Sequence, residues 1–348
     1  MPVKGHGASA GELRADLVFE GGGVKGIALA GAYRELAERG YAPQCVAGTS
    51  AGAITAALVA AGYSGRELEH VVLHEMRFPQ FEDPAFLDDF GRVGQAAEFL
   101  LHRGMHSGDF FLQWISDRLA AKGMTKFGQL RDDTATHPNR TYRLQVIASD
   151  LSTRSMLVLP RDSAALGISD PDELEIAHAV RMSMSIPLFF EPVVLENAKT
   201  GTPHVVVDGG LLSNFPIWLF DLPPGAVPQF PTFGMTLVAP GERVSLAPPP
   251  PGHPQAELRW DIDFLKAIVS TMMDAHDRIA MDAATEARTI ALPTLGVGTT
   301  DFAIDPAQAR ALFNAGRAAT ARFLDGWSFE GYIERFRADR DEAGATRP

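Results

Sequence analysis

Residues 16–62 read DLVFEGGGVKGIALAGAYRELAERGYAPQCVAGTSAGAITAALVAAG, and this stretch decides the fold. Asp16–Glu20 is a short apolar run of the kind found in buried parallel strands, and helical spacing of apolar residues follows over Val24–Arg39. The pattern then repeats, with a strand at Gln44–Ala47 and a helix at Ala51–Ala61. Strands that alternate with helices over short connections predict a parallel sheet with right-handed crossovers.

The rest of the chain continues this alternation and predicts an α/β fold. Expected strands lie at Tyr142–Ala148, Val193–Leu195, His204–Val207 and Phe233–Val238, and expected helices at Glu173–Ser183, Phe264–Met281 and Pro306–Leu324. The last helix has Asp305 in the capping position and Pro306 in its first turn, where both are favoured. No internal repeat divides the chain, so residues 1–348 are expected to form a single domain.

The composition argues against several classes of protein. With 31 basic and 43 acidic residues the net charge is −12, which argues against non-specific nucleic-acid binding. The single cysteine, Cys45, excludes an internal disulfide and a cysteine-rich zinc site. Met1–Leu17 contains no apolar signal region, so a cytoplasmic location is expected, with signal-less export left open. Residues 40–65 carry no charge, but Pro43 and a small, polar centre argue against a transmembrane helix.

Two segments stand apart from the alternation. Residues 78–114 are expected to form a helical insertion, which either packs its own core or serves as a lid with an apolar surface for lipid. Its aromatic residues are Phe78, Phe81, Phe86, Phe90, Phe99, Phe110, Phe111 and Trp114. The end of the chain, residues 335–348, is charged and is expected to fray.

A first chemical motif, Gly21-Gly-Gly-Val-Lys-Gly26, lies between the first strand and the first helix. It matches the G-x-G-x-x-G pattern of dinucleotide-binding proteins, but Tyr41–Ser50 supplies no acidic residue for a ribose. It also lacks the lysine and hydroxyl residue that a phosphate-binding P-loop requires. What remains is a glycine loop and a helix start, which bring backbone N–H groups close to an anion, either a phosphate or a developing oxyanion.

The second motif, Gly48-Thr49-Ser50-Ala51-Gly52, lies between the second strand and the second helix. The pattern G-x-S-x-G in this position is typical of a nucleophile elbow, because small flanking residues let the chain turn sharply. Ser50 would stand at a helix N-terminus, where negative charge is favoured. A tight turn with a serine cap is the alternative interpretation.

The third motif provides a candidate base, which a serine nucleophile needs. None of the ten histidines sits in an obvious turn at a strand end. Asp208, followed by Gly209 and Gly210, comes directly after the apolar residues Val205–Val207. Strand ends of this kind are where ligands meet parallel sheets, so Asp208 is the candidate base. An aspartate that only caps the turn would show the same pattern.

Together the three motifs resemble those of the patatin-like phospholipase family, over roughly residues 16–326. Members of that family combine a glycine-rich oxyanion loop and a G-x-S-x-G serine with a later D-G-G or D-G-A aspartate, and use no catalytic histidine. Further segments carry the resemblance: Gly104–Asp109, Phe127–Leu130, Ala148–Leu151, Ser183–Leu188 and Asn214–Pro216. The resemblance implies a three-layer α/β/α sandwich around a mixed, mainly parallel sheet. Its catalytic core would be residues 16–222, and residues 223–326 would add strands and helices that complete the domain.

The resemblance also implies a role for each matching residue. Ser50 resembles the family nucleophile and Asp208 the base of a Ser–Asp dyad, whose burial is expected to raise its proton affinity. The oxyanion loop would comprise Gly21, Gly22, Gly23, Val24, Lys25 and Gly26. The family often has aspartate and arginine where this chain has Glu20 and Lys25. This departure puts in question how the loop is braced and how a substrate phosphate is held.

The activity implied is that of a metal-independent serine lipid acyl hydrolase, of the phospholipase A or lysophospholipase type. It would work through an acyl-enzyme and need neither a metal nor a cofactor. Its partners would be a phospholipid or lysophospholipid, a membrane surface contacted transiently and, as for some members, a protein activator. An acyltransferase that uses the same acyl-enzyme stays open. A Ser–His–Asp esterase and a phosphate- or nucleotide-binding module are the remaining alternatives.

Overall fold

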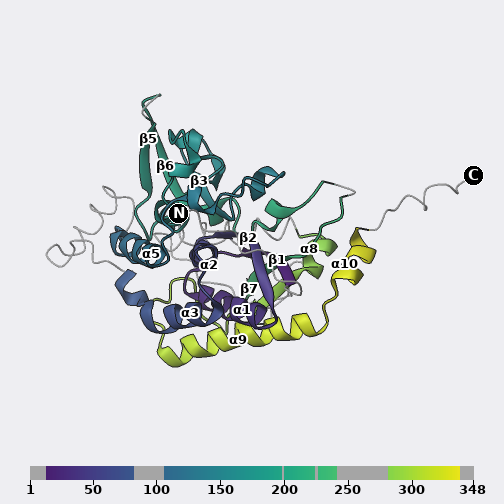
Figure 1. Ribbon diagram of the computed structural model, residues 1–348. Helices are drawn as coiled ribbons and strands as arrows, with labels where there is room; N and C mark the ends of the chain where they lie inside the picture. Colours follow the sequence, from purple (N-terminus) through teal and green to yellow (C-terminus); the bar gives the residue numbers. More distant parts are fainter. Residues whose placement is uncertain (1–12, 82–105, 198–199, 224–225, 241–280, 338–348) are drawn as a thin grey trace, which may run out of the picture.

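The computed structural model describes residues 13–81, 106–197, 200–223, 226–240 and 281–337, and its centre is an eight-stranded mixed sheet (Figure 1). The strands are β1 (Leu13–Phe19), β2 (Tyr41–Thr49), β3 (Leu144–Asp150), β4 (Ser155–Leu159), β5 (Val193–Asn197), β6 (Thr202–Asp208), β7 (Thr232–Val238) and β8 (Thr289–Pro293). Their order is β5-β6-β3-β2-β1-β7-β8, with β4 paired to β3 beside this path. The run from β3 to β8 is parallel, whereas β4, β5 and β6 pair in antiparallel fashion. The sheet is therefore mixed and mainly parallel, as predicted.

Helices enclose this sheet in the three-layer α/β/α arrangement that the sequence predicts. The helices are α1 (Ile27–Glu38), α2 (Ala51–Ala60), α3 (Gly65–His70), α5 (Asp109–Ala121), α6 (Ile176–Ser183), α8 (Ala283–Ala287), α9 (Pro306–Asp325) and α10 (Phe329–Phe336). Helices α1 and α9 lie side by side along one face, and α9 is the long yellow helix at the edge of Figure 1. Helix α2 packs against β1, β2 and β3.

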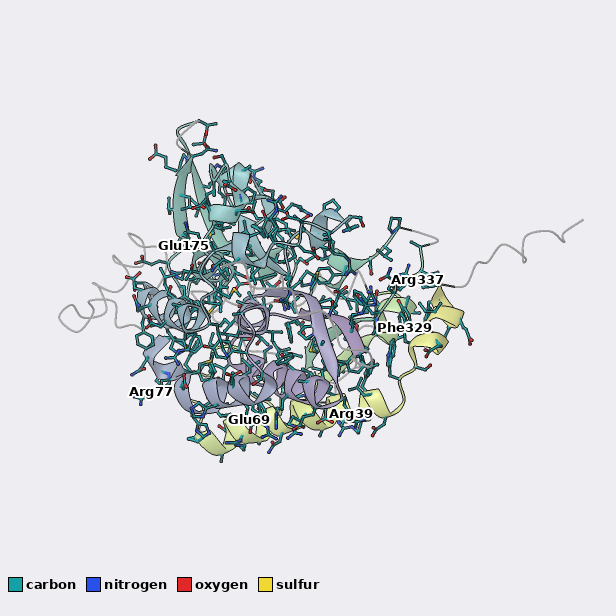
Figure 2. All side chains as sticks on the ribbon, in the orientation of Figure 1. Arg39, Glu69, Arg77, Glu175, Phe329 and Arg337 are labelled. Atoms are coloured by element: carbon teal, nitrogen blue, oxygen red, sulfur yellow. The ribbon has the colours of Figure 1, made fainter. Side chains whose placement is uncertain are left out.

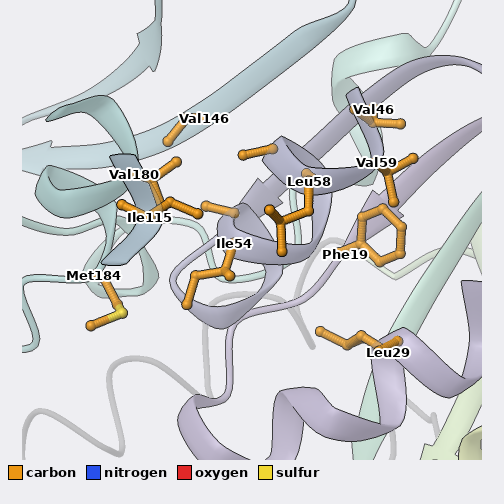
Figure 3. Close-up of a cluster of buried hydrophobic side chains, with 14 of the residues drawn as sticks. Phe19, Leu29, Val46, Ile54, Leu58, Val59, Ile115, Val146, Val180 and Met184 are labelled. Atoms are coloured by element: carbon orange, nitrogen blue, oxygen red, sulfur yellow. The ribbon is translucent and has the colours of Figure 1, made fainter. Parts of the chain in front are cut away.

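Alternation along β1 explains how the sheet is buried on both faces. Leu17 and Phe19 belong to the large core beneath α1 and α2, whereas Val18, between them, belongs to a second cluster on the other face. That second cluster includes Phe215 and Ile217, which follow the D-G-G motif. Every residue of α2 is buried, and Figure 3 shows its side chains within the apolar cluster. The apolar run at residues 40–65 is thus a core strand and a core helix.

Helices α1 and α9 approach each other closely because each has a glycine at the contact. A Cβ atom on Gly31 would lie 2.0 Å from the carbonyl oxygen of Phe313, and one on Gly316 would lie 2.1 Å from that of Ala28. Ion pairs border this contact, with Arg317 bound to Glu35 at 3.2 Å. Figure 2 shows the charged side chains along the same edge of the molecule. The helix pair is therefore built for close backbone contact.

Several expected boundaries differ from the structure. The helix expected from Val24 starts as the 3-10 turn η1 (Gly23–Gly26), because Gly23 has a φ of 56°, outside the helical region. The helix expected from Glu173 begins at Ile176, because Glu175 is extended and pairs with Lys126. Strands β4 and β8 are not predicted from the sequence. Helix α10 extends to Phe336, two residues into the tail expected to fray, and Ser328 caps it.

The aromatic insertion lies partly outside the described residues, as does most of the helix expected at Phe264–Met281. The described parts of the insertion are the 3-10 turn η3 (Phe78–Phe81), residues 106–108 and the start of helix α5, which continues beyond the insertion to Ala121. Phe81 stands at its centre, with ring centroids 5.6 Å from Phe111 and 5.8 Å from Trp114. These rings are buried in the main hydrophobic core of the protein. The described aromatic residues therefore pack with the rest of the fold rather than in a core of their own.

Candidate active site

Ser50 stands at the sharp turn between β2 and α2. Its φ of 53° and ψ of −124° place a non-glycine residue in strained backbone, which costs on the order of 1–3 kcal/mol. The flanking glycines make the turn feasible, because a Cβ on Gly48 would lie 2.3 Å from the Gly52 carbonyl oxygen. The backbone N–H of Ser50 donates to Ser183 Oγ at 2.9 Å, which ties the turn to α6. This geometry is typical of a nucleophile elbow.

Asp208 ends β6 next to the same corner of the sheet. Its partner in the ladder is Ala148 on β3, and the preceding residue of β3, Ile147, pairs with Thr49 just before Ser50. Its backbone N–H donates to the Ser185 carbonyl at 2.9 Å, and its Oδ1 accepts the Gly210 N–H at 2.7 Å. Strand register thus brings together two residues that are 158 positions apart in the chain.

The Asp208 carboxyl is fully buried, and burial raises its pKa to about 7. The Ser50 hydroxyl and the Gly210 N–H act in the opposite direction and lower the pKa, but by less. Within the described residues, neither Ser50 Oγ nor Asp208 Oδ2 makes a hydrogen bond of good geometry to any group. Neither atom is therefore committed to another group that the structure describes. A carboxylate with a pKa near 7 has the proton affinity that a general base needs at neutral pH.

The glycine loop lies against Ser50. A Cβ on Gly21 would be 3.2 Å from Ser50 Cβ, and one on Gly26 would be 2.8 Å from Ala51 Cβ. Both positions therefore require glycine for the loop to approach the elbow.

Three of the loop N–H groups expected to face an anion already have an acceptor, and the first of them, Gly21 N–H, donates to the Asn214 carbonyl at 3.0 Å. Val24 N–H donates to the Thr299 carbonyl at 3.0 Å, and Lys25 N–H donates to the Gly22 carbonyl at 3.2 Å. Within the described chain, the N–H groups of Gly22 and Gly23 have no acceptor. Gly22 and Gly23 are therefore candidate donors, whereas Val24 and Lys25 are not, because an N–H group that already has a partner is not available to an oxyanion.

Glu20 braces the glycine loop from the end of β1. Its Oε2 accepts hydrogen bonds from the Thr236 hydroxyl, at 2.6 Å, and from the Leu237 N–H on β7. Its Oε1 accepts from Asn214 Nδ2 at 3.3 Å, and the same nitrogen donates to the Gly21 carbonyl at 3.2 Å. Glutamate at this position, one carbon longer than aspartate, thus spans from the loop to β7.

An apolar pocket opens beside the elbow and encloses about 560 Å³, including its mouth. At the elbow end it is bounded by Gly23, Gly26 and Ala51. Its walls come from the helices and aromatic segments around it: Ile27, Ile54, Thr55, Leu58, Leu68, Val72, Met76, Phe78, Phe81, Met184, Ile186, Phe190 and Phe302.

Several residues of this site were not identified from the sequence. Ser183 and Ser185 fall in a segment quoted for the resemblance, but nothing in the pattern shows that they hold Ser50 and Asp208. Asn214 follows the D-G-G motif closely, and this position is the signal that could have identified it. Thr299 acts through its backbone carbonyl, so no side-chain pattern reveals it.

The buried histidine of β6, His204, interacts with Asp150 and not with Ser50. His204 Nδ1 lies 2.7 Å from Asp150 Oδ2, and Asp150 pairs along the sheet with Val206. No hydrogen bond between a histidine and Ser50 occurs in the described part of the chain. The Ser–His–Asp interpretation therefore has no geometric support here.

The chain is similar to known proteins over most of its length. The sequence profile of the patatin-like phospholipase family matches residues 17–221. The chain is 41% identical to the uncharacterized protein YqhO of Bacillus subtilis (strain 168), over 90% of this chain and 99% of that protein. It is 28% identical to the uncharacterized NTE family protein MT2641 of Mycobacterium tuberculosis, over 77% of this chain and 39% of that protein. The solved structure of VipD from Legionella pneumophila has a TM-score of 0.48 at 16% identity, over 91% of this chain and 67% of that one.

Proposed function

Because the chain belongs to the patatin-like phospholipase family, we propose that it is a metal-independent serine hydrolase of lipid acyl esters, of the phospholipase A or lysophospholipase type. The observation that carries the proposal is the meeting of three segments at one point. Ser50 stands on a strained turn, the buried Asp208 carboxyl faces it, and the free N–H groups of Gly22 and Gly23 lie on the loop beside it. Nucleophile, base and oxyanion donors are the parts that acyl transfer requires.

In the first half-reaction, Ser50 Oγ attacks the ester carbonyl carbon while Asp208 Oδ2 accepts the hydroxyl proton. The Gly22 and Gly23 N–H groups stabilise the tetrahedral oxyanion, and one such donor typically contributes about 3 kcal/mol. The intermediate then expels the alcohol, here a lysophospholipid or glycerol derivative, which takes the proton from Asp208. An acyl-enzyme on Ser50 remains.

In the second half-reaction, Asp208 accepts a proton from water, and the resulting hydroxide adds to the acyl carbonyl. The second tetrahedral intermediate releases the fatty acid, and Ser50 Oγ recovers its proton from Asp208. A base with a pKa of about 7 can both take and return this proton near neutral pH.

The apolar pocket beside Ser50 supports a substrate with a hydrocarbon acyl chain. Phospholipids and lysophospholipids have such chains, and the proposed enzyme reaches them by transient contact with a membrane surface, from a cytoplasmic location. In the described segments, no helix combines the length and apolar character needed to cross a bilayer. A protein activator, as the resemblance implies for some members, belongs to the same proposal.

The test is fatty-acid release from mixed phospholipid vesicles in the presence of a chelator, with Ser50→Ala beside the wild type. Ser163→Ala is the matched control, because it also removes a buried serine hydroxyl, which within the described residues donates to the Ile168 carbonyl. We expect release by the wild type and Ser163→Ala and none by Ser50→Ala. Equal release by Ser50→Ala would overturn the assignment of the nucleophile.

A further inference from the structure

The chain segment Thr294–Phe302, here called the C-terminal strap, follows β8 and lies beyond the residues that match the family profile. It is held in place by its own hydrogen bonds. Thr294 N–H donates to the Val238 carbonyl at 3.0 Å, and Gly298 N–H donates to Asp301 Oδ2 at 2.6 Å. The strap therefore has a fixed conformation and is hydrogen-bonded to the end of β7.

The strap touches the glycine loop directly. The Thr299 carbonyl accepts the Val24 N–H at 3.0 Å, and a Cβ on Gly23 would lie only 2.0 Å from the same oxygen. Gly23 also has a φ of 56°, which favours glycine. The strap thus meets the loop at the residue that bounds the elbow end of the apolar pocket.

Phe302, at the end of the strap, forms part of the pocket wall. Its side chain is 4% exposed and lines the pocket. Its ring stacks on Phe189, with centroids 4.9 Å apart and planes 17° apart, and lies 6.4 Å from Phe78. Phe189 contacts Phe190, and Phe78 contacts Phe81, in both cases edge to face. The Phe302 ring therefore links two aromatic pairs from separate parts of the chain, Phe189 with Phe190 and Phe78 with Phe81.

From this arrangement we propose that Phe302 is a specificity-determining residue, which limits the width of the acyl group that the pocket accepts. The proposal rests on the proposed acyl hydrolase function. Removing the Phe302 ring opens the wall between Phe189 and Phe78 and leaves space continuous with the pocket. Among the described residues, the aromatic contacts of the Phe302 ring are with Phe78 and Phe189 and not with the proposed dyad, so the chemistry itself should continue.

The test compares two isomeric esters, p-nitrophenyl octanoate and p-nitrophenyl 2-propylpentanoate, which differ in branching but not in carbon number. We expect the wild type to prefer the linear ester, and Phe302→Ala to reduce this preference in kcat/KM by about tenfold or more. Phe313→Ala is the matched control. It removes an equally buried ring of the same core, outside the pocket, and should keep the wild-type preference.

A second readout is independent of turnover. Calorimetric binding of octanoate and 2-propylpentanoate should show the same loss of preference in Phe302→Ala. An unchanged preference, or an equal shift in Phe313→Ala, overturns the assignment of Phe302. Ester cleavage that persists in Ser50→Ala overturns the proposed function instead, and the binding comparison then decides the role of Phe302. If an alanine variant does not fold, Phe302→Leu and Phe313→Leu replace the pair.

Discussion

At Asp208 the proposed chemistry opposes the stability of the fold. The carboxyl is fully buried, and among the described residues it is the hydrogen bond from the Gly210 N–H and the nearby Ser50 hydroxyl that offset the loss of water. Burial disfavours the charged form, which is why the pKa rises to about 7. The ionised base that proposed catalysis needs is therefore the form that the folded protein tolerates least.

The first prediction concerns the pH dependence of activity. Asp208 accepts a proton only when ionised, so kcat/KM should rise with pH through about 7 and level off above it. Steady-state rates with a soluble ester between pH 5 and 9 measure this. Asp208→Asn keeps the shape but not the base, and should lose nearly all activity. Full activity of Asp208→Asn would point to another base.

The second prediction concerns stability. The folded-state pKa of Asp208 is about 7 against an ordinary 3.8, so the folded state binds the proton more tightly. The stability that protonation contributes is fully present below about pH 4 and is lost as the pH rises through 7. Asp208→Asn should therefore be more stable than the wild type at pH 8, by on the order of 3–4 kcal/mol for a shift of this size, and not at pH 4.

Denaturant unfolding at the two pH values measures this difference, and two comparisons control it. Asp133→Asn changes an exposed carboxyl and should show no such gain. Asp16 is the other buried aspartate with a raised pKa, about 6, because burial outweighs Arg140 beside it. The change in stability that comes from ionising Asp16 is nearly complete by about pH 7, and it is the same in the wild type and in Asp208→Asn. A stability difference that does not change with pH would contradict the assignment to Asp208.

At the scale of elements, the contact between α1 and α9 depends on Gly31 and Gly316. The third prediction is that Gly316→Ala lowers the free energy of unfolding by roughly 1–3 kcal/mol or more, because the new methyl group would overlap the Ala28 carbonyl. Thermal unfolding followed by circular dichroism measures it. In α10, Gly331→Ala is the matched control, since the nearest atom is 3.5 Å away. Gly331→Ala should raise the free energy of unfolding by about 0.5–1 kcal/mol, because alanine is normally more stable than glycine inside a helix.

At the scale of the whole molecule, residues after the family profile complete the fold. Strand β7 pairs with β1, helix α9 covers α1, and the strap touches the glycine loop. We therefore propose that residues 16–326 form one folding unit, in which residues 16–222 alone would leave β1 at an open edge.

The fourth prediction follows from that arrangement. A chain that ends at Leu222 should lack cooperative unfolding and activity, because it loses the partner of β1 and the cover of α1. Calorimetry and size-exclusion chromatography measure the outcome. Removing only residues 338–348 is the matched control and should leave both properties intact. A cooperative transition in the shorter chain would show that the core folds by itself.

Local patterns determined much of this protein. The alternation of strands and helices in residues 16–62, the small residues around Ser50 and the glycines after Asp208 depend on neighbours in the sequence, so sequence alone predicts them. The first two motifs meet because β1 and β2 are parallel and end at the same edge of the sheet. Asp208 reaches them from β6, which runs antiparallel to β3, so only the register of these strands places it there.

Contacts between distant segments were decided only by the tertiary structure. The direction of the Asp208 pKa shift is expected from the sequence, but the antiparallel pairing of β6 that puts this carboxyl beside Ser50 is not, and neither is the brace from Glu20 to β7. The Thr299 carbonyl is a backbone group that every residue has, so no pattern marks it as the partner of Val24. Periodicity reports which face of an element is buried, but only packing decides what lies against that face.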